Sequence, residues 1–320
     1  MARAVDVADL VARARDGQPR AVARLISLVE DQSEHLRDVA VALAPYTGRA
    51  HIVGLTGSPG VGKSTTTSAL VSAYRAADAR VGVLAVDPSS PFSGGALLGD
   101  RIRMQEHALD PEVFIRSMAS RGHLGGLSWA TPQALRVLDG AGCDVILVET
   151  VGVGQSEVEV IGVADTVVVL LAPGMGDGIQ AAKAGILEIG DVFAVNKADR
   201  DGADATAREL RHMISLAERA AGAWRPPVVK TVAARGEGIP DLLAAIEKHR
   251  TWSLDSGAGV VRRERRAAQE IEALAMATLR SRLNFGQMGE LAAGVAGGLL
   301  DPYQAADQLV AASAHAAIRD

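Results

Sequence analysis

The chain has 320 residues, of which 48% are hydrophobic, so it can bury a sizeable core in one large domain or in two. Its formal net charge of −5 at pH 7 gives no overall attraction to nucleic acid or to an anionic membrane, and 3% aromatic residues offer few platforms for base stacking. The single cysteine excludes an internal disulfide framework and a metal site built on paired cysteines.

The first residues lack the long apolar core of a signal peptide, and charged residues recur through the following stretch. The longest apolar run, residues 167–173, is too short to cross a bilayer. We therefore expect a cytoplasmic protein with no membrane partner and no nucleic-acid partner.

Residues 5–45 carry apolar side chains at helical spacing, for example at Leu10, Val11 and Ala14, with a break at 16–19. This pattern predicts an N-terminal helical segment over residues 1–48. From residue 51 to about 250, strand-like apolar runs alternate with amphipathic helical stretches. The alternation predicts an α/β fold over residues 49–252, with a doubly wound, mostly parallel sheet that binds its ligand beyond the carboxyl ends of the strands. The expected strands are 51–56, 81–86, 113–115, 144–148, 166–172, 192–195 and 228–232.

A glycine-rich loop joins the first expected strand to an expected helix over residues 64–74. It fits the pattern G-x-x-x-x-G-K-[ST] in the strand, loop and helix setting that this pattern needs, so we predict a P-loop nucleoside triphosphatase fold. The glycines let several N–H groups point at the phosphates, and the helix N-terminus favours negative charge. Lys63 would reach the β- and γ-phosphates, and the Ser64 hydroxyl would ligate Mg²⁺. The residues expected to contact nucleotide are Gly57, Ser58, Pro59, Gly60, Val61, Gly62, Lys63, Ser64 and Thr65.

Two aspartates follow in the next long loop. Asp87 ends the expected strand 81–86, and Asp100 lies further along the loop. Both are candidates to approach Mg²⁺ or the attacking water, because a carboxylate at a strand end is costly beside phosphates unless it meets a cation. Asp100 is equally suited to be the N-cap of a helix over residues 101–107.

The strand 144–148 ends in an acidic residue, Glu149, which is followed by Gly152. This arrangement resembles the metal-side motif of nucleotide hydrolases. Glu149 would hold Mg²⁺ directly or through water, and the Gly152 N–H would sense the γ-phosphate; alternatively, Glu149 caps the following turn. Gln155 is a candidate for orienting the attacking water, although it lies further past the glycine than the corresponding glutamine of Ras-like proteins.

The sequence Asn196–Asp199 follows the strand 192–195 and has the pattern N-K-x-D, which favours guanine over adenine. The Asp199 carboxylate can accept from both guanine N1–H and the N2 amino group, and adenine has no such donor pair. Lys197 would lay its stem over the base, and Asn196 would tie this loop to the phosphate loop. After the strand 228–232, a backbone N–H of Ala233 or Ala234 is a candidate contact to guanine O6.

The stretch 253–259 predicts a turn, and two further helices are expected after it, so we expect a separate C-terminal helical segment over residues 253–320. The first of these helices has an apolar stripe that includes Ile271, Leu274 and Leu279, and its first turns carry the charged run 262–266. The stripe would pack on the main domain or on another subunit. The charged run is typical of a solvated face.

Together, the motifs at 54–64, 86–90, 149–157 and 196–199 resemble the MeaB/ArgK family, as do the loops 116–126 and 173–177. The resemblance covers most of the chain. It implies a Mg²⁺-dependent GTPase that binds GTP and GDP and acts as a chaperone of adenosylcobalamin-dependent methylmalonyl-CoA mutase. Such a chaperone gates delivery of the cofactor and protects the mutase from inactivation.

The resemblance also implies a homodimer made through the C-terminal helices, with switch loops near 87–100, 152–157 and 174–183. Relatives often have an acidic residue where this chain has Gly178, so we expect a contact made by that acidic side chain to be missing here. Two alternatives stay open from the residues: a kinase or transport-coupled ATPase, against which Asp199 argues, and a nickel-loading metallochaperone GTPase, which usually has Cys or His clusters.

Overall fold

The computed structural model describes residues 5–31, 33–88, 105–120, 130–150, 162–174, 187–220, 222–283 and 285–316. The chain forms two compact units, Met1–Gly259 and Val260–Asp320. The N-terminal helical segment and the sheet share the first unit. The domain boundaries expected at residues 48 and 252 stay a prediction.

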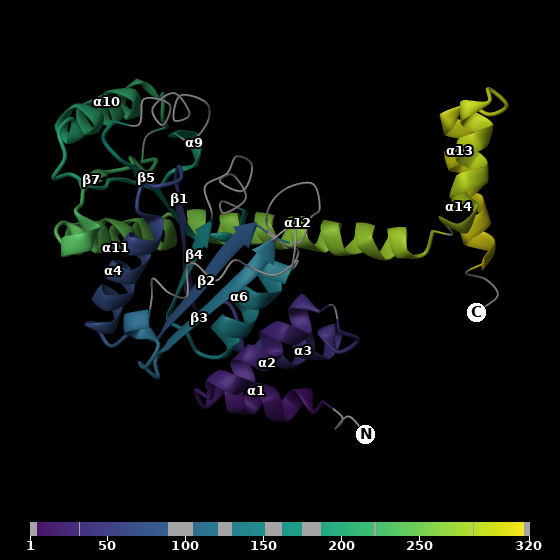
Figure 1. Cartoon of the computed structure of the whole chain (residues 1–320), viewed down its shortest axis with the longest axis horizontal. Helices are drawn as coiled ribbons and strands as arrows, with labels where there is room; N and C mark the ends of the chain where they lie inside the picture. The colour runs from purple at the N-terminus through teal and green to yellow at the C-terminus, as the bar shows by residue number, and fades with distance from the viewer. Residues whose placement is uncertain are drawn as a thin grey trace. The chain divides into compact units, whose positions relative to one another are not determined.

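The first unit is built on a seven-stranded sheet, counted over the described residues, in the order β3-β2-β4-β1-β5-β6-β7 (Figure 1). All of its strand pairs are parallel. Every residue of the four strands β1, β4, β5 and β6 is buried, which explains why they are continuous apolar runs in the sequence. The predicted α/β fold with a doubly wound parallel sheet is confirmed. The strands are β1 (His51–Thr56), β2 (Val81–Pro88), β3 (Val113–Ser120), β4 (Val145–Thr150), β5 (Thr166–Leu171), β6 (Val192–Val195) and β7 (Val228–Lys230).

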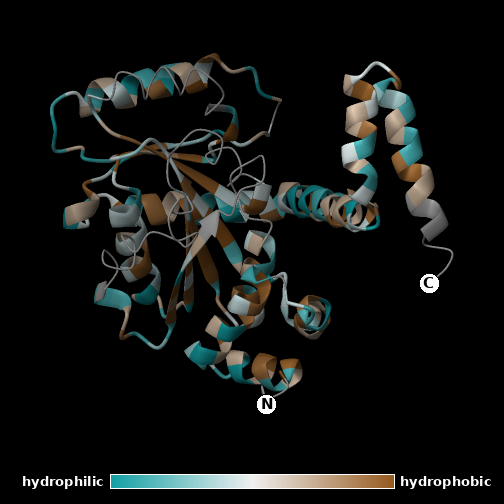
Figure 2. Cartoon of the chain, turned by 45° about the vertical axis from the view of Figure 1, so that its right-hand side comes forward, coloured by the Kyte–Doolittle hydropathy of each residue, from teal (hydrophilic) through white to brown (hydrophobic). Residues whose placement is uncertain are grey.

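Helices cover both faces of this sheet, whose strands are drawn mostly in the brown of apolar residues in Figure 2. On one face α4 (Lys63–Arg75) and α11 (Ile239–Asp255) pack together, with Leu70 and Ile246 buried in the core. On the other face α6 (Ala130–Gly140) and α10 (Ala203–Leu216) bury Leu138 and Leu210. The short helices of this unit are η1 (Ala44–Tyr46), η2 (Gln105–His107), α9 (Leu187–Ile189) and η4 (Ala233–Arg235).

The N-terminal segment adds three helices to the second face, as its apolar spacing predicted. They are α1 (Val7–Arg15), α2 (Pro19–Glu30) and α3 (Leu36–Leu43), and both α2 and α3 pack on α6. The helix α2 begins with a proline, whose fixed φ suits the first helical turn, and it buries Leu25 and Ile26 completely. This segment therefore extends the main core.

Four aspartates organise the edge of the sheet at which the strands begin. Asp139 accepts backbone N–H groups from residues 48–50, including Ala50 at 2.9 Å. In the same way, Asp165 and Asp191 accept from the second residues of β1 and β5, at 3.1 and 2.8 Å, and Asp144 accepts at 2.8 Å from the residue just before β2. Since strand ends otherwise leave buried amides without partners, these carboxylates fix where each strand starts. The opposite, carboxyl edge carries the predicted ligand-binding motifs.

A buried line of polar side chains crosses the same starting edge. Thr166 Oγ1 lies 2.8 Å from His51 Nε2 and 2.8 Å from His249 Nδ1. His249 Nε2 lies 3.3 Å from a carboxylate oxygen of Asp191. These contacts join β1, β5 and α11, so they hold together the strands that lead to the carboxyl edge.

The second unit contains α12 (Ala258–Ser281) from Val260 onward, together with η5 (Phe285–Gln287), α13 (Met288–Ala296) and α14 (Pro302–Ala316). The expectation of two helices is therefore wrong, because the stretch after α12 folds as a pair, α13 and α14, that pack on each other. The expected turn is also shorter than predicted, since Ser253–Asp255 complete α11. Every residue of α12 is at least partly exposed, including Ile271, Leu274 and Leu279.

The remaining differences concern strand ends. The strand β3 runs to Ser120, beyond the expected 113–115, because it pairs with β2 along its whole length. The strand β7 is shorter than expected and ends at Lys230, where its described pairing with β6 stops. No described helix is both long enough and apolar enough to cross a membrane.

Candidate functional site

The phosphate loop lies at the carboxyl end of β1, the central strand, and leads directly into α4. Gly57 and Gly62 have φ values of +140° and +98°. A Cβ at Gly57 would lie far inside van der Waals contact of the Leu170 carbonyl oxygen, and one at Gly62 would overlap the Asn196 side chain. Glycine is therefore required at both positions, for backbone conformation and for space.

Lys63 lies over this loop and is mostly buried. Its Nζ donates to the carbonyl oxygens of Gly57, at 2.6 Å, and Ser58, at 3.3 Å. The residue is 8% exposed at the first position of α4, where helix amides and the helix dipole also favour an anion. The ammonium group of Lys63, the N-terminus of α4 and the backbone of the glycine-rich loop therefore lie together, as a phosphate-binding site requires.

Behind the loop, the buried carboxylate of Glu149 at the end of β4 receives two hydroxyls from α4. Ser64 Oγ donates to Glu149 Oε1 at 2.6 Å, and Thr67 Oγ1 lies 3.0 Å from Glu149 Oε2. Glu149 is 4% exposed, a burial that is costly for a carboxylate unless it meets donors or a cation. Hard oxygen donors of this kind fit Mg²⁺, so Ser64 and Glu149 are suitable residues to hold it.

Asn196 connects the phosphate loop to the loops after β6 and β7. Its Nδ2 donates to Val61 O at 2.9 Å, as the N-K-x-D pattern predicted. Its Oδ1 accepts from Ala233 N at 3.0 Å and from Thr231 Oγ1 at 3.2 Å. Since the Ala233 amide is donated to Asn196, Ala234 is the better candidate of the two for a contact to guanine O6.

The other two members of this motif lie nearer the surface, with Lys197 half-buried and Asp199 exposed. Lys197 has a φ of +57° and donates from Nζ to Gly60 O at 2.6 Å, so its stem spans from the base loop to the phosphate loop. Asp199 lies 3.6 Å from the guanidinium of Arg235, which also pairs with Glu237 at 2.8 Å. Arg235 is a neighbour of the base site that the sequence reasoning missed.

Several predicted residues fall outside the described part of the chain: Asp100, Gly152, Gln155, Gly178 and most of the three switch loops. Asp87 is the second-to-last residue of β2, and its backbone pairs with Ala119 of β3. Its side chain is not among the parts that the structure describes. Their roles stay predictions. Of the remaining phosphate-loop residues, Ser58 is half-buried and Pro59, Gly60 and Thr65 are exposed.

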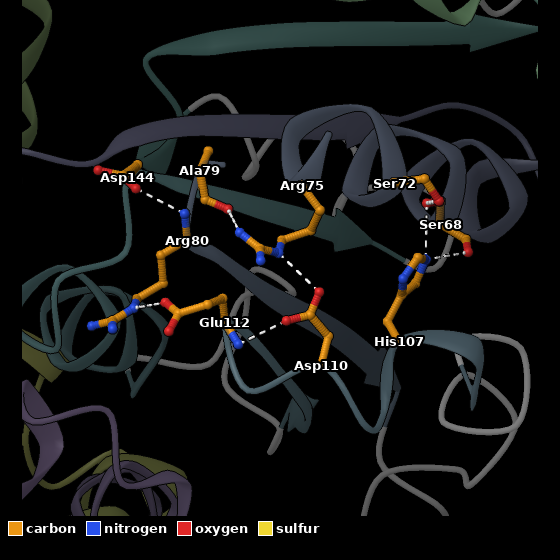
Figure 3. Close-up of polar contacts among 9 residues, drawn as sticks. All are labelled: Ser68, Ser72, Arg75, Ala79, Arg80, His107, Asp110, Glu112 and Asp144. Carbon is orange, nitrogen blue, oxygen red and sulfur yellow. Dashed lines mark hydrogen bonds and ion pairs between the residues drawn. The ribbon is translucent and has the colours of Figure 1, made fainter. Parts of the chain in front are cut away.

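A second polar cluster ties the segment before β3 to α4 (Figure 3). His107 Nε2 lies 3.0 Å from Ser68 Oγ and 3.1 Å from Ser68 O. Arg75 pairs with Asp110 at 2.9 Å, and this hydrogen bond lowers the pKa of the Asp110 carboxyl. The helix that follows the phosphate loop is thereby anchored on two sides, by Glu149 and by the segment that leads into β3.

Comparison with known proteins agrees with this geometry. A sequence profile of the family described as "Methylmalonyl Co-A mutase-associated GTPase MeaB" matches residues 22–287. A Pyrococcus abyssi protein is 48% identical over 309 residues, which cover 94% of this chain and 95% of that protein. The name of that protein describes it as a GTPase. The Escherichia coli protein "GTPase ArgK" is 38% identical over 78% of each chain. The crystal structure of an "LAO/AO transport system kinase" aligns with a TM-score of 0.72 and 27% identity, over 96% of this chain and 98% of the other.

Proposed function

Because the chain belongs to the MeaB family and is a GTPase, we propose that it is a chaperone of an adenosylcobalamin-dependent methylmalonyl-CoA mutase. In this role it would gate delivery of the cofactor and protect the mutase from inactivation. The family description supports the client, since it names association with methylmalonyl-CoA mutase. We also expect a cytoplasmic location, which stays a prediction.

The observation that carries the nucleotide part of the proposal is the joining of the two predicted motifs by Asn196. The phosphate loop and the base loop lie 135 residues apart in the sequence and are linked by a hydrogen bond of 2.9 Å. A single ligand that has phosphates and a guanine base would contact both loops at once. GTP and GDP are such ligands.

In the proposed mechanism each described side chain has a distinct role. Lys63 and the loop amides stabilise charge on the β- and γ-phosphates. Ser64 and Glu149 would hold Mg²⁺, which when bound would neutralise charge on the phosphate oxygens. Asp199 selects guanine, and the Lys197 stem covers the base. Asp87, Asp100, Gly152 and Gln155 are proposed from the sequence alone to position metal, water or γ-phosphate.

Base selection is tested with the substitution Asp199→Asn. An amide at this position offers a donor, which matches the C2 carbonyl of xanthine better than the N2 amino group of guanine. We expect GDP affinity to fall and XDP affinity to rise. Unchanged selectivity would contradict the role of Asp199, and ATP competing as well as GTP would favour the kinase or transport-ATPase alternative.

The client is tested by measuring GTP hydrolysis with and without the mutase of the same organism, at saturating Mg²⁺. We expect the mutase to accelerate hydrolysis and Lys63→Ala to lose both the basal and the accelerated rate. Hydrolysis that the mutase leaves unchanged would refute the proposed client while leaving the GTPase intact.

We further propose a homodimer that forms through α12. Its apolar residues Ile271 and Leu279 are 67% and 56% exposed. Packing against a partner surface would remove these side chains from water. The test is the mass of the particle in solution for the wild type and for Ile271→Asp. A wild-type monomer, or a variant that stays dimeric, would contradict this interface.

A further inference from the structure

Thr67 is a buried hydroxyl in the second turn of α4 to which the sequence assigned no role. Its Oγ1 lies 3.0 Å from Glu149 Oε2 and 3.0 Å from Lys63 O, and the residue is fully buried. Ser64, three residues earlier on the same helix face, contacts the other oxygen of the same carboxylate at 2.6 Å. The helix therefore contacts Glu149 at both of its oxygens.

The neighbouring Thr66 shows what is particular to Thr67. Thr66 is also fully buried, and its Oγ1 donates to Gly62 O at 2.9 Å, four residues back along the chain. Thr67 has the equivalent backbone acceptor in Lys63 O and the carboxylate in addition. A hydroxyl donates a single proton, and an ionised carboxylate is a stronger acceptor than a peptide carbonyl. The Thr67 proton is thus donated to Glu149.

We propose that Thr67 is a positioning residue for the metal side of the site. By holding Glu149 Oε2, it fixes the plane of the carboxylate, so that Oε1 stays on the Ser64 hydroxyl. The Ser64 proton is then directed at Glu149, so the Ser64 oxygen would meet a cation as a ligand. The inference rests on the proposed role of Glu149 in holding Mg²⁺.

The expected size of the effect follows from the usual behaviour of such partners. Removing the residue that orients a metal ligand lowers metal affinity by about 10- to 100-fold. Without Thr67, Glu149 keeps the Ser64 contact on Oε1 and loses the hydroxyl that holds Oε2. We therefore expect a loss of about tenfold in apparent Mg²⁺ affinity, at the lower end of that range.

The experiment compares Thr67→Val with Thr66→Val. Valine keeps the shape of threonine and removes the hydroxyl, so each variant loses one buried hydrogen bond. Thr66→Val loses the bond to a backbone carbonyl, and Thr67→Val loses the bond to the Glu149 carboxylate. The readout is the affinity for a fluorescent GDP as free Mg²⁺ is varied. We expect the Mg²⁺ concentration of half effect to rise about tenfold in Thr67→Val, and to stay near the wild-type value in Thr66→Val. Affinity for GDP in EDTA stays unchanged in both.

Two further variants separate the possible failures. Thr67→Ser retains the hydroxyl and is expected to restore the wild-type Mg²⁺ response. Glu149→Gln tests the premise: if it leaves the Mg²⁺ response unchanged, the metal role of Glu149 is wrong and the inference fails with it. If Glu149→Gln abolishes the response but Thr67→Val behaves like Thr66→Val, the metal role stands and the positioning role of Thr67 is overturned.

Discussion

The link made by Asn196 gives the sharpest prediction about stability. The substitution Asn196→Ala removes three hydrogen bonds, to Val61 O, Ala233 N and Thr231 Oγ1, from a residue that is 3% exposed. The Thr231 hydroxyl can rotate about its Cβ–Oγ1 bond, whereas the direction of the Ala233 amide is fixed by the backbone. The amide is therefore the group that is most costly to leave without its acceptor.

The magnitude follows from these contacts. A buried donor left unsatisfied costs about 1–3 kcal/mol, and a typical hydrogen bond contributes about 1 kcal/mol. We take about 2 kcal/mol for the Ala233 amide and about 1 kcal/mol for the Val61 carbonyl, and expect a loss of about 3 kcal/mol in the free energy of unfolding. For a domain of this size the melting temperature falls by about 2–4 °C per kcal/mol, which gives roughly 6–12 °C.

The assay is thermal and urea unfolding followed by tryptophan fluorescence, combined with GDP binding. Thr231→Val is the control, because it removes one of the three contacts, the longest at 3.2 Å, and should cost about 1 kcal/mol or less. Asn196→Ala should also weaken GDP binding, since the two loops lose their link. If Asn196→Ala unfolds at the wild-type urea midpoint and binds GDP with wild-type affinity, the reasoning is wrong.

Three other predictions follow from single contacts. Gly57→Ala should abolish GDP binding, measured by titration, because its Cβ would overlap Leu170 O and its φ of +140° disfavours alanine. The hydrogen bond from Arg80 lowers the pKa of Glu112. The ion pair therefore stabilises the fold at pH values above the ordinary carboxyl pKa, and this stabilisation is lost as the pH falls through the lowered pKa of the folded state. The difference in urea midpoint between wild type and Glu112→Gln should shrink from pH 7 to pH 3. Burial raises the pKa of the Cys143 thiol to about 12, and alkylation at pH 8 should label it only after unfolding; rapid labelling of the native protein would contradict this burial.

Local patterns were enough to predict the elements that sequence neighbours define. The strands β1 and β6 have the predicted bounds, because a parallel strand buried on both faces is a continuous apolar run. The phosphate loop could be predicted because its glycines, Lys63 and Ser64 are consecutive in the chain. The N-K-x-D loop could be predicted for the same reason. The expected end of β3 was wrong, since its length is set by pairing with β2 along residues 81–88.

The residues that support the site were decided by the tertiary structure. Thr67 meets Glu149 across 82 residues, and Asn196 meets Val61 across 135. The order of the strands brings them together, since β4 lies beside β1 and the register places Glu149 opposite Leu55, two residues before the phosphate loop. A side chain's hydrogen-bond partner depends on which strands become neighbours. By itself, the sequence therefore determined the chemistry of the site, and only the folded sheet decided which residues hold that chemistry in place.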